Sequence, residues 1–169
     1  KRDYSDHGIV VVDGSELSRI KDKKNKKEII AYNHNQEYKT FLSPDDTYYS
    51  QQWALSKIGA PEAWDKATGS NEIVVAVLDT GFVLDHEDLA GRFVEGRDVV
   101  DNDSDPSLPA GGGTAIAHGT LVSGIIAGIA NNSKGVAGLD WNVKIMPIRV
   151  MDNNGNGNTA TVAAGINYA

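Results

Sequence analysis

The sequence predicts an α/β domain in which a mostly parallel sheet is flanked by helices. Residues 73–78 (IVVAVL) form a continuous apolar run, which is typical of a parallel strand buried on both faces. Residues 144–151 (KIMPIRVM) predict a second strand, although Pro147 is unusual inside a strand. Residues 119–129 (GTLVSGIIAGI) lie between them and predict a buried helix with close packing at Gly124 and Gly128. Strands that alternate with helices favour a parallel sheet.

The composition excludes several classes of protein. The chain has 169 residues, a net charge of −7 and no cysteine, so disulfides, zinc–thiolate sites and cysteine nucleophiles are excluded. No apolar run approaches the roughly 18 residues that a membrane span requires. An acidic chain is a poor partner for nucleic acid, because phosphate binding needs a basic face.

The first forty residues predict a small unit of their own. Residues 8–13 and 28–32 predict two strands, Ser15 is a candidate cap for a helix that reaches Ile20, and residues 21–27 form a basic run. Residues 1–43 have a net charge of +2, whereas residues 44–169 have a net charge of −9. A strand–helix–strand unit of this size is too short to bury a core alone.

The remaining elements follow in chain order. Residues 33–49 are polar and predict a linker, and residues 55–64 predict a short helix that is interrupted at 59–61. Residues 85–105 predict a loop rich in carboxylates, and residues 109–114 (PAGGGT) predict a flexible segment. Residues 152–158 predict a Gly/Asn turn, and a helix begins at Thr159.

Two residues have the placement of catalytic groups. Asp79 ends the first apolar strand, where ligands and catalytic groups gather in open α/β sheets. His118 opens the predicted helix, and a neighbouring carboxylate would make it a usable general base. Taken singly, Asp79 is more simply explained as a turn cap, and His118 as a helix cap or a core histidine.

Together these segments resemble a known family. Residues 75–81 (VAVLDTG), 85–89 (DHEDL) and 118–124 (HGTLVSG) resemble the Asp and His signatures of the subtilisin-like serine peptidases, in that family's chain order. The resemblance covers residues 44–169 and is nearest to the thermitase-like branch. It implies a serine endopeptidase that acts on protein or peptide substrates, with Asp79 and His118 as two members of an Asp–His–Ser triad.

The nucleophile motif of that family, Gly-Thr-Ser-Met-Ala or similar, does not occur in these residues. We therefore expect an N-terminal fragment of a peptidase, inactive by itself. The resemblance also implies that Gly155, Asn156 and Gly157 lie along the substrate backbone, in the strand-addition mode of peptide recognition. An ordinary turn is the alternative for these three residues.

Two groups of oxygen donors are candidate calcium sites. Asp98, Asp101, Asp103 and Asp105 alternate within eight residues, and hard oxygen ligands suit Ca²⁺; a solvated acidic loop is the alternative. The resemblance implies calcium in this loop. It also implies a second calcium site formed by three residues that are distant in sequence: Asp46, Asp88 and Asn132.

The expected organisation is a partial propeptide-like α+β segment at 1–38, a linker and N-terminal arm at 39–52, and an incomplete peptidase domain at 53–169. The basic first segment suits docking on the acidic domain, so the chain's own propeptide is an expected partner. The family implies an extracellular or cell-surface location. A non-catalytic calcium- or peptide-binding module remains the alternative. A phosphate- or nucleotide-binding domain is disfavoured, because no Gly-rich loop follows a strand.

Overall fold

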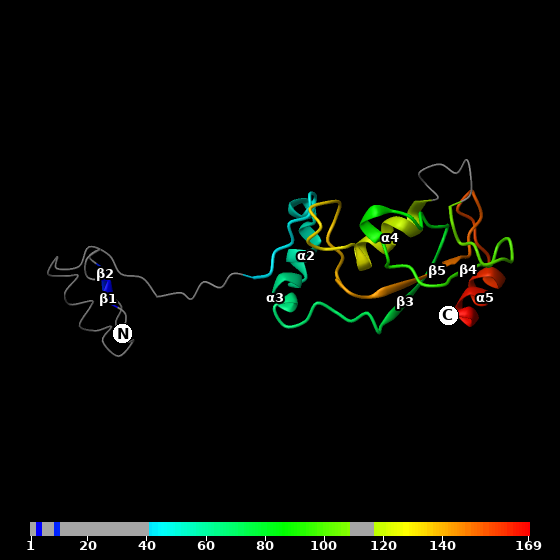
Figure 1. Ribbon diagram of the computed structural model, residues 1–169. Helices are drawn as coiled ribbons and strands as arrows, with labels where there is room; N and C mark the ends of the chain where they lie inside the picture. Colours follow the sequence, from blue (N-terminus) through cyan, green and yellow to red (C-terminus); the bar gives the residue numbers. More distant parts are fainter. Residues whose placement is uncertain (1–2, 5–8, 11–40, 109–116) are drawn as a thin grey trace. The chain divides into compact units, whose positions relative to one another are not determined.

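The computed structural model describes residues 3–4, 9–10, 41–108 and 117–169. The chain separates into two compact units, Lys1–Thr40 and Phe41–Ala169 (Figure 1). In the first unit, β1 (Asp3–Tyr4) pairs antiparallel with β2 (Ile9–Val10), which lies within the strand predicted at 8–13. The predicted helix after Ser15, the predicted strand at 28–32 and the segment 109–114 lie outside the described residues.

The second unit contains the predicted parallel sheet. Within its described residues, β3 (Val74–Asp79), β5 (Lys144–Arg149) and β4 (Arg97–Asp98) lie in the order β3-β5-β4, and both pairings are parallel. Asp79 and Asp98 are both in register with Arg149. The carboxyl ends of all three strands therefore meet at one edge of the sheet, and the α/β fold class is confirmed.

Pro147 lies inside the central strand because the ladder is interrupted beside it. Phe93 pairs with Ile145 and Arg97 pairs with Ile148, so the neighbouring segment uses one residue more than β5 between these two positions. This mismatch is a bulge, and bulges are where proline is tolerated in sheets. The strand predicted at 144–151 is thus confirmed over Lys144–Arg149.

Apolar side chains of β3, β5, one helix and the segments next to the two strands form the main core: Val77, Phe82, Ala127, Val143 and Ile145. A second cluster lies under α2 (Trp53–Lys57) and α3 (Ala60–Trp64), where Leu55, Ala60 and Trp64 pack with Tyr49 and Trp141. Gly59 separates the two helices with a φ of +75°, a left-handed conformation that glycine adopts without a steric penalty. This break agrees with the predicted interruption, although Pro61 lies inside α3.

The helix predicted at 119–129 is α4 (His118–Ala127), but it is not buried on all sides. Leu121 and Ile125 are each 65% exposed. The expectation of close packing at Gly124 is also wrong, because a Cβ built there meets only Val136, at 3.8 Å. The tight positions are Gly119 and Gly128, where a Cβ would lie 2.6 Å from a backbone oxygen. The last helix, α5 (Thr159–Tyr168), begins at a capping box on Asn158.

The polar segment 44–52, called the arm below, is bound to the second unit rather than free as a linker. Its backbone donates from Tyr48 N to Gly135 O at 2.9 Å. The side chain of Gln52 exchanges two hydrogen bonds with the backbone of Ala137, each 2.9 Å long. Two short 3₁₀ turns, η3 (Tyr49–Gln51) and η4 (Glu87–Leu89), complete the unit. No helix in the part of the chain that is described is long and apolar enough to cross a membrane.

Candidate functional site

Asp79 ends β3 at the sheet edge where the three strands terminate. The residue is 7% exposed, and its Oδ1 accepts from the backbone N–H of Thr80 at 2.7 Å and from the Thr80 hydroxyl at 3.0 Å. These two bonds fix the carboxylate plane. The fixed carboxylate then faces the first residue of α4.

His118 is that first residue, and its ring contacts Asp79. Nδ1 of His118 lies 2.8 Å from Oδ2 of Asp79 and 3.0 Å from Oδ1. Because a carboxylate accepts hydrogen bonds, this contact favours the tautomer of the neutral ring that has its proton on Nδ1 and its lone pair on Nε2. The side chain of His118 is 63% exposed, and that of Asp79 only 9%. The buried carboxylate of Asp79 therefore orients the imidazole of His118, whose exposed ring could accept a proton from a reacting group.

The helix that carries His118 approaches the strand closely because Gly119 has no side chain. A Cβ at this position would lie 2.6 Å from Gly81 O and 3.0 Å from Asp79 Cβ. Thr120 fixes the same approach, since its hydroxyl accepts from the backbone N–H of Val83 at 2.9 Å. Three consecutive residues, His-Gly-Thr, thus supply the imidazole, the room for the close approach and the hydrogen bond that fixes it.

Gly119→Ala is expected to lower the free energy of unfolding of the full-length protein by about 1–3 kcal/mol, as overpacking of a tight contact does. Gly124→Ala on the same helix is the matched control, because its Cβ meets only Val136 at 3.8 Å. That control should gain up to about 1 kcal/mol from helix propensity. Urea unfolding of both variants measures the difference, and equal midpoints would contradict the close approach.

Gly155, Asn156 and Gly157 lie on an exposed turn between β5 and α5. Asp152 organises the turn, because its Oδ1 accepts from the backbone N–H groups of Asn154 and Asn156, both at 2.9 Å. These backbone bonds lower the pKa of Asp152, which keeps it ionised. An open hollow of about 600 Å³ lies beside the turn, lined by Met151, Gly157, Asn158, Thr159, Val162, Ala163 and Ile166.

Asp46, Asp88 and Asn132 come together although they are distant in sequence; we call them the arm site. Asn132 Nδ2 donates to Asp88 Oδ1 at 2.8 Å, and Asp46 Oδ2 accepts from the backbone of Asn131 at 2.8 Å. Asp46 Oδ1 is buried and has no hydrogen-bond partner among the residues described. Burial, and next the charge of Asp88, raise the pKa of Asp46, against the hydrogen bond from Asn131. An orphaned buried oxygen beside a second carboxylate fits a bound cation.

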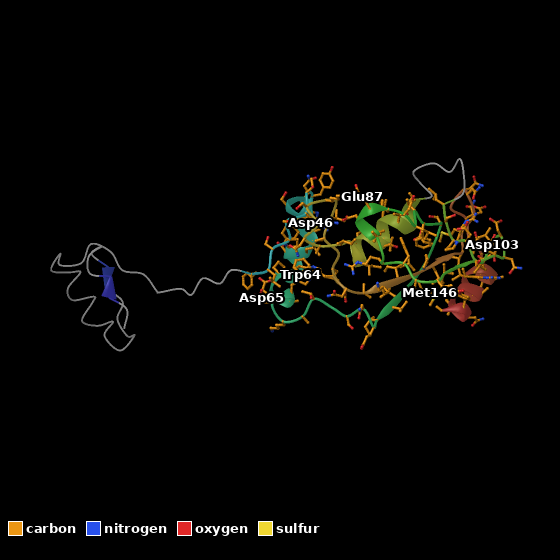
Figure 2. All side chains as sticks on the ribbon, in the orientation of Figure 1. Asp46, Trp64, Asp65, Glu87, Asp103 and Met146 are labelled. Atoms are coloured by element: carbon orange, nitrogen blue, oxygen red, sulfur yellow. The ribbon has the colours of Figure 1, made fainter. Side chains whose placement is uncertain are left out.

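Residues 98–105, called the acidic loop, lie far from the arm site; Figure 2 labels Asp46 and Asp103 at opposite ends of the second unit. Asp98 Oδ1 accepts from the backbone N–H groups of Val100 and Asp101, and Asp98 Oδ2 accepts from Arg149 at 2.5 Å. Asp101 Oδ2 also accepts from Arg149, at 2.5 Å. Asp103 and Asp105 are exposed. One side-chain cation, Arg149, therefore already pairs with two of the four aspartates and offsets one of their negative charges.

Sequence reasoning missed Arg149, which is 3% exposed at the end of β5. The available signal was a charged residue at the end of a buried apolar run. Its partners could not be predicted, because Asp98 and Asp101 lie about fifty positions earlier in the sequence. Across the described ranges, no three acidic or imidazole side chains converge closely enough to hold a metal ion as placed. The arm site has two carboxylates, and Asn132 supplies an amide.

The sequence was then compared with known proteins. A model of the subtilase family of peptidases matches residues 70–169. Over 128 residues the chain is 47% identical to thermitase of Thermoactinomyces vulgaris. The matched region covers 75% of this chain and 43% of that protein. It is 35% identical to halolysin of Haloferax mediterranei, over 80% of this chain and 26% of that protein. Others among these relatives are named extracellular proteases.

Solved structures give the same picture. A protease from Pseudoalteromonas arctica is 36% identical, with a TM-score of 0.65, over 74% of this chain and 43% of that one. A serine protease of Aeromonas sobria, solved in complex with a chaperone, has a TM-score of 0.64 at 24% identity and supports the fold alone. The chain spans less than half the length of each of these proteins.

Proposed function

The chain belongs to the subtilase family, in its thermitase-like branch, and we propose that the full-length protein is a serine endopeptidase in which Asp79 and His118 are two members of the triad. His118 Nε2 would take the proton of an attacking serine hydroxyl and then pass it to the leaving amine. Asp79 would hold Nδ1–H and stabilise the imidazolium. The contact of Nδ1 with Asp79 Oδ2 at 2.8 Å is the observation that carries this proposal.

The nucleophile and the oxyanion donors belong, in this proposal, to parts of the protein outside these 169 residues. We therefore expect the 169-residue chain by itself to hydrolyse no peptide. The test is to express the full-length protein, to assay it on a denatured protein substrate, and to treat it with a fluorophosphonate that labels activated serines. Hydrolysis with stoichiometric labelling supports the peptidase. Calcium binding without labelling would instead favour the non-catalytic module.

Gly155, Asn156 and Gly157 are proposed to bind the backbone of the peptide substrate. All three residues are exposed, but the backbone N–H of Gly155 and both backbone groups of Asn156 are bonded within the turn, so the C=O of Gly155 and the backbone of Gly157 are the groups proposed for strand addition. The hollow beside Met151, Val162 and Ile166 is mostly apolar in its lining residues, which suits a side chain of the bound peptide.

Calcium is proposed to bind at the arm site, with oxygens of Asp46, Asp88 and Asn132 as ligands. The ion would satisfy Asp46 Oδ1 and offset the repulsion between the two carboxylates. Its role would be structural, because it joins the arm to the loop that begins at Asn131. Calcium is also proposed at the acidic loop with weaker affinity, because Arg149 already pairs with Asp98 and Asp101. The exposed oxygens of Asp101, Asp103 and Asp105 would then provide most of that site.

The effect of Asp46→Asn on the melting temperature should reverse its sign between calcium and chelator. In saturating calcium the variant is expected to melt about 10 °C below the wild type, because a ligand present at a thousand times its Kd stabilises by about 4 kcal/mol. In chelator it should melt at the same temperature or higher, because it removes a buried, repelled charge. That advantage should shrink as the pH falls through the raised pKa of Asp46, since protonation then neutralises the wild-type residue too.

Asp45→Asn is the matched control for this experiment. Asp45 is the exposed neighbour, and it accepts from the backbone and the hydroxyl of Ser133 at 3.0 and 2.9 Å. Its melting temperature should follow that of the wild type in both conditions. A calcium-dependent melt that is the same in wild type and Asp46→Asn would contradict the arm site.

Residues 1–38 are proposed to act as a propeptide-like segment for the domain at 53–169, with the arm and its approach at 39–52 between them. The support is the separate compact unit Lys1–Thr40 and the opposite net charges of the two parts. The names of the relatives support export of the full-length protein to the extracellular space or the cell surface.

A further inference from the structure

Arg149 is a buried cation at the edge of the sheet where the proposed triad residues lie. It is the last residue of β5, and it is in register with Asp79 on one side and Asp98 on the other. Its side chain is only 4% exposed. A buried charge is costly unless it is paired, so its contacts indicate what it does: both Nη atoms are paired, whereas Nε is buried with no hydrogen-bond partner among the described residues.

The guanidinium joins two segments that are distant in sequence. Nη1 donates to Asp98 and to Asp101 of the acidic loop, both at 2.5 Å. Nη2 donates to the side-chain oxygen of Asn153 at 2.9 Å. Burial alone would lower the pKa of Arg149, but the hydrogen bonds to Asp98 and Asp101 raise it above its ordinary value. The pKa of the guanidinium is thus raised despite its burial, and the group is charged.

Asn153 lies in the turn that leads to the proposed peptide-binding edge. The turn is closed on itself by the bond from Asp152 N to Asn156 O at 2.8 Å, and Met151 pairs with Gly157 at its base. These bonds shape the turn internally. The bond from Arg149 to Asn153 instead joins the turn to a residue outside it. Arg149 is itself fixed by its place in β5 and by its bonds to the acidic loop.

We propose that Arg149 is a positioning residue for peptide binding: its guanidinium holds the 152–158 turn, and with it the edge at Gly155, Asn156 and Gly157, in a fixed place beside the sheet. This inference rests on the proposed peptide-binding role of that edge. A preorganised edge binds without a further ordering cost, so loss of the tie weakens peptide binding and leaves the chemical step unchanged. Arginine suits this position because its rigid planar fork directs one terminal nitrogen to each segment.

The test removes the tie at its exposed end, so that the buried ion pair is kept. Asn153→Ala deletes the acceptor of Arg149 Nη2, whereas Asn153→Asp keeps an oxygen there. Asn154→Ala is the control, because Asn154 is an exposed neighbour that is bonded to Asp152 rather than to Arg149, mainly through its backbone N–H and more weakly through its side chain. All are made in the full-length protein, and two readouts are taken: hydrogen exchange of the backbone amides at 154–157, and kcat and KM on a peptide substrate.

Asn153→Ala is expected to speed exchange at 154–157 by about fivefold or more, in line with loss of one charge-assisted hydrogen bond. Its KM should rise about three- to tenfold with kcat within about twofold, and Asn153→Asp should restore both values. Unchanged exchange in Asn153→Ala would overturn the tie, and faster exchange with an unchanged KM would overturn the positioning role. If the full-length protein cleaves no peptide, the proposed function fails, while the exchange comparison still decides whether Arg149 holds the turn.

Discussion

His118→Ala is expected to lower kcat of the full-length protein by about 10⁶-fold, with KM nearly unchanged, because the general base acts only in the chemical step. Asp79→Asn should lower kcat by about 10⁴-fold, since an amide at this position favours the wrong tautomer of the imidazole. In the native site both carboxylate oxygens lie within 3.0 Å of Nδ1, which fixes the tautomer with Nε2 free. The measurement is kcat and KM of each variant on a chromogenic peptide.

Folding controls separate this loss from a structural defect. The side chain of His118 is 63% exposed, so its removal should leave the melting temperature within about 2 °C of the wild type. Lys57→Ala, an exposed substitution on α2 outside the Asp79–His118 contact, should keep full activity. The double variant of His118 and Asp79 should be no slower than His118→Ala, because the two residues act as one unit. Activity of His118→Ala within tenfold of the wild type would show that another base operates.

The sheet could be predicted from the sequence because its strands are locally distinct. Residues 73–78 and 144–151 are apolar runs bounded by turn residues, and such runs identify buried strands without knowledge of their partners. Placing Asp79 at a strand end followed directly from that prediction. By contrast, β1 (Asp3–Tyr4) has only two residues and no alternation, so nothing local distinguishes it from a loop.

The exposure of α4 could not be predicted, because it depends on which face of the helix meets the sheet. A segment of small and apolar residues is compatible with burial on any side, and its glycines all look equally suited to close packing. In the structure Gly119 lies against Gly81 and Asp79, Gly128 is tight as predicted, and Gly124 has room. The face of α4 that meets the strand is fixed by tertiary contacts such as the hydrogen bond between Thr120 and Val83, which are thirty-seven positions apart.

The cation that pairs with the acidic loop could not be predicted either, because it too depends on a tertiary contact. Four aspartates within eight residues give a strong local pattern for a divalent cation. The positive charge that two of them meet comes from Arg149, and the register of β5 with β4 is what brings it there. A pattern within one segment therefore indicates that negative charge must be neutralised, but only the topology identifies the cation.

Arg149→Met is expected to lower the free energy of unfolding by about 3–5 kcal/mol, because it leaves the carboxylate of Asp98 buried without its cation. Asp98 is 2% exposed, so water cannot replace the lost partner. The double variant Asp98→Asn with Arg149→Met removes both charges and keeps an oxygen for the backbone N–H groups of Val100 and Asp101. Neutralising both partners of a buried pair is often harmless, so the double variant should recover most of the loss, to within about 1–2 kcal/mol of the wild type.

Asp101→Asn tests the exposed half of the same network. Its side chain is 63% exposed, so water screens the pair and the loss should be about 1 kcal/mol or less. Urea unfolding of the four proteins in excess chelator gives the comparison without calcium, for which Asp101 is itself a proposed ligand. If Arg149→Met and its double variant with Asp98→Asn unfold at the same urea concentration, the penalty does not come from an unpaired Asp98. The stability of the sheet edge would then depend on the packing of the Arg149 side chain rather than on its charge.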